Sequence, residues 1–134
     1  MVCVHCGQKT QVTNSRPQRR TNQVWRRRIC LGCSAVFSTL EMADYGAVWL
    51  VKGSSGHLEP FSRDKLFLSL HNSCQHRPTA LADAGALADT VINKLSSLSN
   101  NGVMAVQSIT MTAKITLEHF DKPASVHYQA FHKT

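Results

Sequence analysis

The sequence contains few acidic residues and no long apolar run. Eight of its 134 residues are Asp or Glu, against 15 Lys or Arg, and the first forty positions contain no acid at all. No apolar run approaches the ~20 residues that a membrane helix needs, so we expect no membrane-spanning segment. Paired carboxylates in a pocket context and a nucleophile motif are also missing, which argues against an enzyme.

Cysteine, in contrast, occurs in a pattern typical of a metal site. Two Cys-x-x-Cys pairs, Cys3/Cys6 and Cys30/Cys33, are separated by 23 residues. Together they offer four thiolates, the ligand set of a tetrahedral structural zinc ion, whereas two disulfides or chance cysteines are the alternative. Met1 is followed at once by the first pair, so we expect no secretory signal and a reducing cytoplasm, where thiols bind metal. We predict one Zn²⁺ per chain.

Two further points follow from the cysteines. Four thiolates fill a tetrahedral zinc site, so no position is left for the water that a catalytic zinc requires. Cys74 has no partner nearby in the sequence and lies in an apolar helical pattern. We therefore predict that Cys74 is a small core residue.

The positive charge is concentrated at the start of the chain. Residues 1–47 contain seven Lys or Arg against two acids, a net charge of +5, while residues 48–134 contain eight against six, a net charge of +2. Solvated surfaces usually mix both signs. A small cysteine-rich module that carries most of the excess charge therefore predicts a polyanionic partner such as nucleic acid.

Residues 1–46 are predicted to form a small zinc-binding domain. Asn14–Pro17 has the composition of a turn, and Gln23–Ile29 and Ala35–Leu40 are predicted strands of a small antiparallel sheet. About 45 residues have too little apolar core to fold alone, so zinc would serve as the core.

The central predicted strand carries three consecutive arginines. Because side chains alternate along a strand, Arg26 and Arg28 should share one face and Arg27 should lie on the other. Val24 and Trp25 are expected near the zinc core.

Residues 47–134 are predicted to form a second domain, a β-hairpin followed by four helices, which gives an α+β fold class. Val48–Val51 and His57–Phe61 would be the strands. Ser62 and Thr79 are predicted helix caps, Asn100–Gly102 is a predicted helix stop, and Pro123 opens the last helix. The predicted inward-facing residues of the helices are Leu66, Phe67, Leu70, Cys74, Leu81, Ala84, Leu87, Ala88, Val91, Leu95, Leu98, Ile109, Ala113, Leu117, Phe120, Ala124, Tyr128 and Phe131.

The motif order in the first domain resembles the zinc ribbon of the bacterial NrdR family of ribonucleotide reductase regulators. Asn14-Ser-Arg16 corresponds to the family's D-S-R turn, with Asn14 in place of the aspartate. Arg26 to Cys33 corresponds to its arginine run into the second cysteine pair, and Phe37 to Glu41 to its F-T-T-Y-E strand.

The second domain is similar to an ATP-cone. Val51-Lys52, Glu59 to Leu66, Arg77-Pro78 and Ala124 to Phe131 follow the hairpin, E-P-F-D-R-E-K, K-R-P and C-terminal helix patterns of that domain. The resemblance covers nearly the whole chain in the right order. The combination is more specific than either half, because zinc ribbons and ATP-cones each occur in other proteins.

The resemblance implies a nucleotide-responsive transcriptional repressor in the bacterial cytoplasm, associated with the nucleoid. It would bind double-stranded operator DNA of ribonucleotide reductase genes as a homo-oligomer, and ATP or dATP in the cone would change the oligomeric state. Arginines would contact phosphates and guanine edges. Arg19 and Arg20, added from charge alone, are expected to touch phosphate only. The family positions for DNA contact are Arg16, Arg26, Arg27 and Arg28.

The same resemblance places the nucleotide contacts at Val51, Lys52, Glu59 and Lys65. The two lysines match phosphate-binding positions, Glu59 matches a hairpin glutamate at the site, and Val51 would flank the base. Phe131 and His132 lie where the last helix of the family borders the pocket, and core packing is the alternative for Phe131.

Several positions depart from the cone pattern. Gly53 stands where the family has a phosphate-binding arginine, and Ala105-Val106 align with its hydroxyl pair, which Ser108 could replace. Ser125 and His127 replace a tyrosine and an arginine of the last helix. The cone would therefore bind more weakly, bind another nucleotide, or serve only oligomerisation. The last possibility is the alternative function, a zinc-ribbon DNA-binding protein with a degenerate cone.

Overall fold

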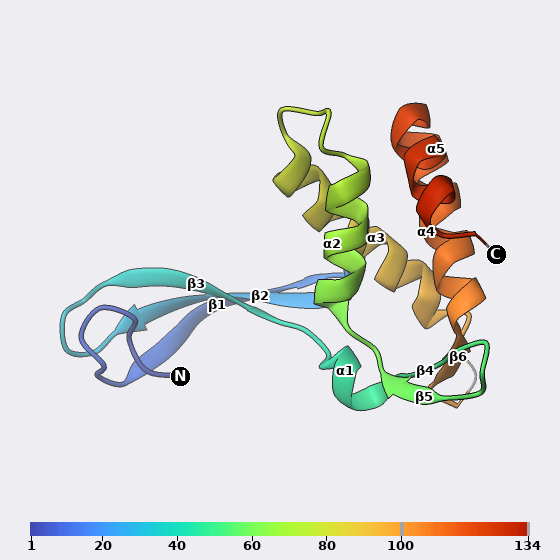
Figure 1. Ribbon diagram of the computed structural model, residues 1–134. Helices are drawn as coiled ribbons and strands as arrows, with labels where there is room; N and C mark the ends of the chain where they lie inside the picture. The colour runs from blue at the N-terminus through green and yellow to red at the C-terminus, as the bar shows by residue number, and fades with distance from the viewer. Residues whose placement is uncertain (100, 134) are drawn as a thin grey trace. The chain divides into compact units, whose positions relative to one another are not determined.

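The computed structural model describes residues 1–99 and 101–133, so Asn100 of the predicted helix stop lies outside the described residues. The chain separates into two compact units, Met1–Ala43 and Asp44–Thr134. The first consists of strands and turns, and the second of helices with short strands (Figure 1). The predicted α+β class is confirmed.

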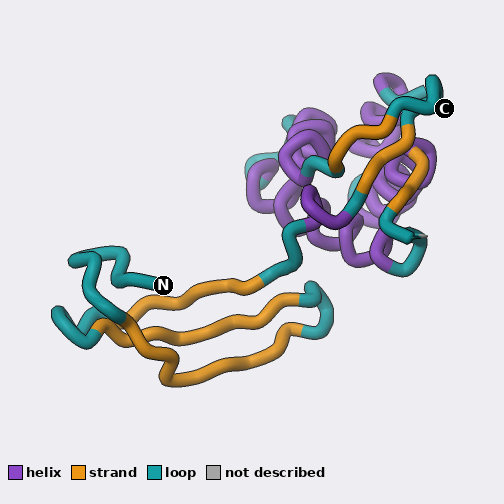
Figure 2. Tube along the Cα trace, turned by 90° about the horizontal axis from the view of Figure 1, so that it is seen from below, coloured by secondary structure: helices purple, strands orange, loops and turns teal. Residues whose placement is uncertain are grey.

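Three antiparallel strands form the sheet of the first unit. They are β1 (Thr10–Gln18), β2 (Gln23–Cys30) and β3 (Val36–Glu41), in the order β1-β2-β3, and they run side by side (Figure 2). Only Cys3 and Cys30 are buried in residues 1–43. The sheet therefore has no apolar core of its own, and a metal ion has to supply one.

The predicted turn at Asn14–Pro17 is wrong, because these residues lie inside β1. β1 is an edge strand, where proline is tolerated because one row of backbone groups has no ladder partner. The chain reverses at residues 19–22 instead, where Asn22 has a positive φ of 51°. Asparagine adopts this backbone conformation more readily than most residues.

The expected position of Val24 and Trp25 near the zinc core is also wrong. Val24 pairs with Pro17 and Glu41, at the end of β2 opposite to Cys30. At about 3.3 Å per residue, five or six residues of strand correspond to roughly 16–20 Å. These two side chains therefore belong to the far end of the sheet.

The second unit begins with a short helix that was not predicted, and the predicted strand Val48–Val51 begins two residues later, at Leu50. Val48 ends the short helix α1 (Tyr45–Val48), whose first turn is closed by the Asp44 carboxylate accepting from the Ala47 N–H at 3.3 Å. The predicted hairpin follows as β4 (Leu50–Lys52) and β5 (Leu58–Pro60), which pair antiparallel.

A third strand completes this sheet and was not predicted. β6 (Val103–Ala105) pairs parallel with β4, which gives the order β5-β4-β6. Leu50 donates its N–H to the Gly102 carbonyl at 2.7 Å just before the pairing begins. Gly102 has a φ of +76°, and a Cβ there would lie 2.8 Å from the Val48 carbonyl oxygen, so this junction requires glycine.

Four helices make up the rest of the second unit. They are α2 (Arg63–Ser73), α3 (Ala80–Ser96), α4 (Val106–Phe120) and α5 (Lys122–Phe131). Neighbours pack in a closed ring, since α2 contacts α3 and α5, and α4 contacts the same two helices. Within the described residues, no helix combines the length and apolarity needed to cross a membrane.

The predicted caps are partly confirmed. The Ser62 hydroxyl accepts from the Lys65 N–H at 3.2 Å and begins α2 as expected. Thr79 precedes α3 but donates its hydroxyl to Asp83 at 2.6 Å instead of capping the backbone. Asp121 caps α5 by accepting from the Ala124 N–H at 3.0 Å.

The predicted helical stripes form the core, with exceptions at the helix ends. Leu81 and Leu98 are exposed near the two ends of α3, beyond the reach of its neighbours, and Phe120 is 40 % exposed. Phe131, predicted to face inward, is 74 % exposed. Cys74 is fully buried within the apolar cluster, as predicted, and burial raises the pKa of its thiol.

An ionic network joins the α2–α3 connection to the start of α5. The Arg77 guanidinium donates to Asp83 and to Asp121, each at 2.8 Å, and lies over the Phe120 ring at 4.6 Å. His76 lies 3.2 Å from the Asp121 carboxylate. The Ala124 N–H and Arg77 together hold the pKa of Asp121 at about 2.

This network predicts acid sensitivity of the second unit. The folded pKa of Asp121 lies below the value of about 3.9 for an unfolded aspartate, so its contribution is present above about pH 4 and is lost as the pH falls toward 2. Asp121→Asn should melt at a lower temperature than the parent at neutral pH and lose less on acidification. Thermal melts followed by helical circular dichroism test this, with the exposed Asp64→Asn as control. Equal acid sensitivity of Asp121→Asn and the parent would contradict it.

Candidate functional site

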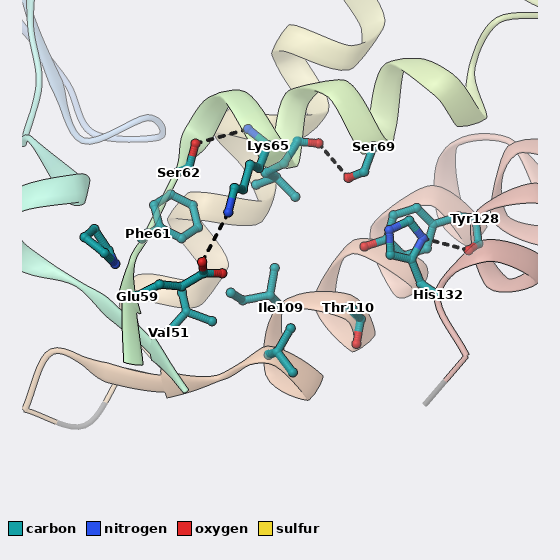
Figure 3. A pocket seen from close by; sticks show the side chains of 13 residues that line it. Val51, Glu59, Phe61, Ser62, Lys65, Ser69, Ile109, Thr110, Tyr128 and His132 are labelled. Carbon is teal, nitrogen blue, oxygen red and sulfur yellow. Dashed lines mark hydrogen bonds and ion pairs between the residues drawn. The ribbon is translucent and has the colours of Figure 1, made fainter. Parts of the chain in front are cut away.

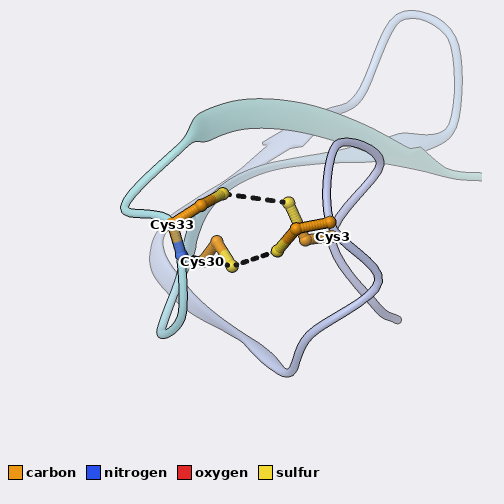
Figure 4. Close-up of side chains that lie close together, drawn as sticks. Cys3, Cys30 and Cys33 are labelled. Carbon is orange, nitrogen blue, oxygen red and sulfur yellow. Dashed lines mark hydrogen bonds between the residues drawn. The ribbon is translucent and has the colours of Figure 1, made fainter.

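The four predicted zinc ligands lie together at one end of the ribbon sheet (Figure 4). All four sulfur atoms lie within 4.8 Å of one another. Cys3 Sγ is 3.8 Å from Cys33 Sγ, and Cys6 Sγ is 3.5 Å from Cys30 Sγ. Tetrahedral Zn–S bonds of about 2.3 Å imply sulfur separations near 3.8 Å. The cluster could therefore hold one zinc ion.

The two cysteine turns have matching backbone geometry. Gly7 and Ser34, each directly after its pair, have φ values of 75° and 61° and donate their N–H groups to the carbonyls of Cys3 and Cys30. The Cys30 sulfur also accepts backbone N–H groups, from Cys33 at 3.4 Å and from Gly32 at 3.3 Å. The Cys33 N–H is the largest cause that lowers the pKa of Cys30, to about 6, which favours the thiolate that metal binding needs.

The ribbon sheet divides the predicted DNA-binding arginines between two faces. Side chains alternate along β2, and residues directly opposite on neighbouring strands share a face. One face, called here the Arg27 face, comprises Asn14, Arg16, Trp25, Arg27 and Leu40. The other, called the Arg26 face, comprises Thr10, Ser15, Arg26, Arg28 and Glu41.

The arginines of the Arg26 face are held by the sheet. Arg26 donates from Nε to the Ser15 hydroxyl at 3.1 Å and forms an ion pair with Glu41. Arg28 donates to the Thr10 hydroxyl at 3.3 Å. Both arginines are half-buried.

The arginines of the Arg27 face are open to solvent. Arg16 and Arg27 are exposed, and within the described residues neither side chain makes a hydrogen bond or ion pair. Arg19 and Arg20, in the β1–β2 turn, are exposed as well. The structure thus brings Arg16 and Arg27 together and separates them from Arg26 and Arg28.

The second unit contains a pocket of about 180 Å³ between the hairpin and helices α2, α4 and α5 (Figure 3). Apolar side chains form most of its wall: Val51, Phe61, Leu66, Val106 and Ile109. The polar side chains that line it are Glu59, Ser62, Lys65, Ser69, Thr110, Tyr128 and His132.

Three of the four predicted nucleotide residues line this pocket. Val51 is buried in its wall, and Lys65 Nζ lies 3.2 Å from a carboxylate oxygen of Glu59 at its edge. Lys52 does not line it, because Lys52 follows Val51 in the strand and points to the other side. The pocket is therefore lined by one lysine and one carboxylate, and the two form an ion pair with each other.

The two arginines of the second unit form ion pairs away from this pocket. Arg63 donates to Asp89 at 2.8 Å, and Arg77 belongs to the network with Asp83 and Asp121. Neither lines the pocket. The positive charge of the missing hairpin arginine is therefore not replaced by Arg63 or Arg77 in this arrangement.

The end of the chain contributes two residues to the pocket, of which the sequence predicted one. His132, predicted at the pocket border, lines the pocket, stacks on Tyr128 at 4.0 Å between ring centroids and donates from Nδ1 to the Tyr128 carbonyl at 3.0 Å. Phe131 does not line it. Tyr128 was predicted as core alone, yet it is buried and also borders the pocket, and burial raises its pKa to about 12. A helical period cannot separate these two roles.

Comparison with known proteins shows relatives that match the sequence of both units. A family model described as "Transcriptional repressor NrdR-like, N-terminal domain" matches residues 1–41. The chain is 36% identical over 106 residues to the transcriptional repressor NrdR of Symbiobacterium thermophilum, which covers 79% of this chain and 70% of that protein. It is 32% identical over 134 residues to NrdR of Rhodospirillum centenum, covering 99% and 86%.

A third relative, NrdR of Afipia carboxidovorans, is 33% identical over 132 residues, which cover 98% of this chain and 80% of that protein. The names of these relatives describe regulators of transcription rather than enzymes. The similarity extends through both units, and the matched N-terminal domain includes all four clustered cysteines. The chain therefore belongs to the NrdR family of transcriptional repressors.

Proposed function

We propose that this chain represses ribonucleotide reductase genes in response to adenine nucleotides. Residues 1–46 bind operator DNA as a zinc ribbon, and residues 47–134 bind ATP or dATP as an ATP-cone and hold several copies together. The observation that carries the proposal is the four-cysteine ribbon with its exposed arginines, in a chain whose relatives are named as repressors.

The charge of the ribbon supports DNA binding. Seven cations and two acids lie in residues 1–47, and Arg16, Arg19, Arg20 and Arg27 are all exposed. Exposed arginines displace condensed counterions when they contact phosphates, and this release supplies most of the affinity for DNA.

The pocket of the second unit supports nucleotide binding. Its apolar wall suits a base, while Lys65 in the first turn of α2 offers a cation beside a helix N-terminus, which favours phosphate. The volume of about 180 Å³ leaves the phosphates at the open edge near Lys65. Lys52, at the outer side of the hairpin, would then reach only the distal phosphates.

The need for several ribbons supports a homo-oligomer. One small module buries less surface than a specific operator complex usually requires. Several ribbons held by cone–cone contacts gain affinity through effective concentration. Nucleotide can control this assembly only if it binds one oligomeric state more tightly than another.

A salt titration tests the DNA half of the proposal. The probe is a short duplex selected by the protein from a randomised pool, with its shuffled sequence as reference. Binding should weaken steeply as salt rises, with a log–log slope of roughly −0.9 for each phosphate contacted. Replacing Arg16, Arg26, Arg27 and Arg28 together with Gln should flatten the slope, whereas Lys122→Gln with Lys133→Gln, both exposed in the second unit, should not. Equal flattening by both sets would place DNA binding elsewhere.

A second candidate function is DNA binding with a cone that only oligomerises. The absent hairpin arginine and the Lys65–Glu59 ion pair favour it, because the pocket then has little net positive charge. Protein melts with ATP and dATP separate the two candidates, since a ligand at 100 times its Kd stabilises by about 2.7 kcal/mol.

A further inference from the structure

We infer that the Arg27 face of the ribbon sheet docks on DNA, with Arg16 and Arg27 reading bases, while Arg26 and Arg28 stay on the protein and position the sheet. The inference rests on the proposed function, because it names the surface through which the ribbon contacts DNA.

Arg26 is already engaged by its own sheet. Its guanidinium donates to the Ser15 hydroxyl on β1 and pairs with Glu41 on β3, so the side chain spans all three strands. Its side chain is 32 % exposed. To reach a phosphate, Arg26 would have to leave a carboxylate and a hydroxyl, and Glu41 would remain on that face to repel the DNA.

Arg28 is held in the same manner, closer to the cysteine cluster. It donates from Nη1 to the Thr10 hydroxyl at 3.3 Å, and Thr10 in turn donates to the Met1 carbonyl at 2.6 Å. Its Nε atom is shielded from solvent but has no hydrogen-bond partner within the described residues, so the bond from Nη1 to Thr10 is the contact that holds the guanidinium. Arg28 therefore ties β2 to β1 and to the start of the chain, which contains the first cysteine pair.

The Arg27 face has the opposite character. Asn14 lies directly opposite Arg27, and Arg16 lies directly opposite Trp25, so Arg16 and Arg27 are diagonal neighbours. Diagonal neighbours in an antiparallel pair are about 7–8 Å apart. No acidic residue of the three strands shares this face, since the one carboxylate in them, Glu41, lies on the other.

The residue types on this face match the edges of purine bases. Arginine binds guanine bidentately in the major groove, and asparagine does the same for adenine. The major groove admits a two-stranded β-ribbon. β1 and β2 form such a ribbon, with Asn14, Arg16 and Arg27 on one side. Trp25, half-buried between Arg16 and Leu40, would lie against the same DNA.

Lysine substitutions test the two faces without a change in charge. Lysine keeps the phosphate contact but loses the bidentate geometry of arginine. In the full chain with zinc, Arg16→Lys with Arg27→Lys should reduce discrimination between the selected and the shuffled duplex by about 10- to 100-fold. Arg26→Lys with Arg28→Lys should change it by no more than about fivefold, since ion pairs near the surface contribute little. Zinc content and circular dichroism verify that each variant is folded.

Fluorescence of Trp25 gives an independent readout. Trp49, the second tryptophan, is 5 % exposed in the core of the second unit, so Trp49→Phe leaves Trp25 as the sole reporter. Its emission should change on addition of the selected duplex, with the same midpoint as binding. The inference would be overturned if the Arg26→Lys/Arg28→Lys variant lost discrimination between the selected and the shuffled duplex while the Arg16→Lys/Arg27→Lys variant kept it, and if Trp25 emission stayed constant. Failure of the parent protein to select any duplex would instead reject the proposed function.

Discussion

Removal of zinc is expected to unfold residues 1–43 and to leave residues 44–133 folded. Cys3 and Cys30 are the only buried residues of the first unit, so its strand pairing and surface contacts have no apolar core beneath them, and the metal site has to supply one. Structural zinc contributes about 10–16 kcal/mol of binding free energy in zinc-finger peptides at pH 7. The second unit buries its own apolar cluster and does not depend on the metal.

Metal analysis and hydrogen exchange measure this outcome separately for the two units. Protein purified without chelator should contain one zinc per chain, and chelation should abolish amide protection in β1, β2 and β3 and all binding to DNA. Cys33→Ser should reproduce this loss. Cys74→Ala is the matched control, since Cys74 is buried in the second unit and should leave the zinc content unchanged. Protection of β2 after complete metal removal would show that the ribbon has another source of stability.

Lys65→Ala is expected to abolish the stabilisation of the protein by ATP and dATP. Among the described residues, Lys65 is the one lysine that lines the pocket between the hairpin and helices α2, α4 and α5. A charge-assisted hydrogen bond to phosphate is worth about 1.5–3 kcal/mol, which corresponds to roughly 10- to 150-fold in affinity. Under the proposed function, Gly53 already leaves the hairpin without one such contact, so a second loss should bring binding below detection by calorimetry.

Three further variants should change the affinity for nucleotide by different amounts and in different directions. Glu59→Gln should tighten binding a few-fold, because it removes the carboxylate that pairs with Lys65 and repels phosphate. Gly53→Arg should tighten it further. A Cβ at Gly53 would lie 3.7 Å from the His57 carbonyl oxygen, an ordinary contact, so a side chain can begin there without a backbone clash. Lys52→Ala should cost less than Lys65→Ala.

Oligomer mass should follow nucleotide occupancy in the same series. If Lys65→Ala binds both nucleotides as well as the parent does, the pocket lies elsewhere. If neither the parent nor Gly53→Arg binds, the cone only oligomerises, and the second candidate function holds.

The ribbon shows what local sequence can predict. Cysteine spacing identified all four cysteines that cluster, because their arrangement depends on residue type and short turns. Alternation along β2 correctly separated Arg27 from its neighbours. The composition of Asn14–Pro17 suggested a turn because proline and asparagine favour turns, but pairing with β2 overrode that preference at the edge of the sheet.

In the second unit, local contacts were predictable from the sequence and contacts between distant residues were not. Ser62 was predictable as a cap because its partner lies three residues away. The pairing of Arg77 with Asp121 joins side chains 44 positions apart, and no local pattern encodes it. Leu81 and Phe131 follow the apolar period of their helices, yet they extend beyond the neighbouring elements and stay exposed. Periodicity gives the direction of a side chain but not whether another element covers it.

The parallel pairing of β6 with β4 has a consequence for the order of folding. Its partners lie more than fifty positions apart, and the entropy of closing so long a loop must be lost before the pairing is gained. An isolated two-stranded hairpin is at best marginally stable in water. The sheet should therefore form late, after α3 has docked. Val51, which pairs with Met104 and lines the pocket, reaches its place only then. We therefore expect the wall of the pocket at Val51 to be completed only late in folding, once β6 has joined β4.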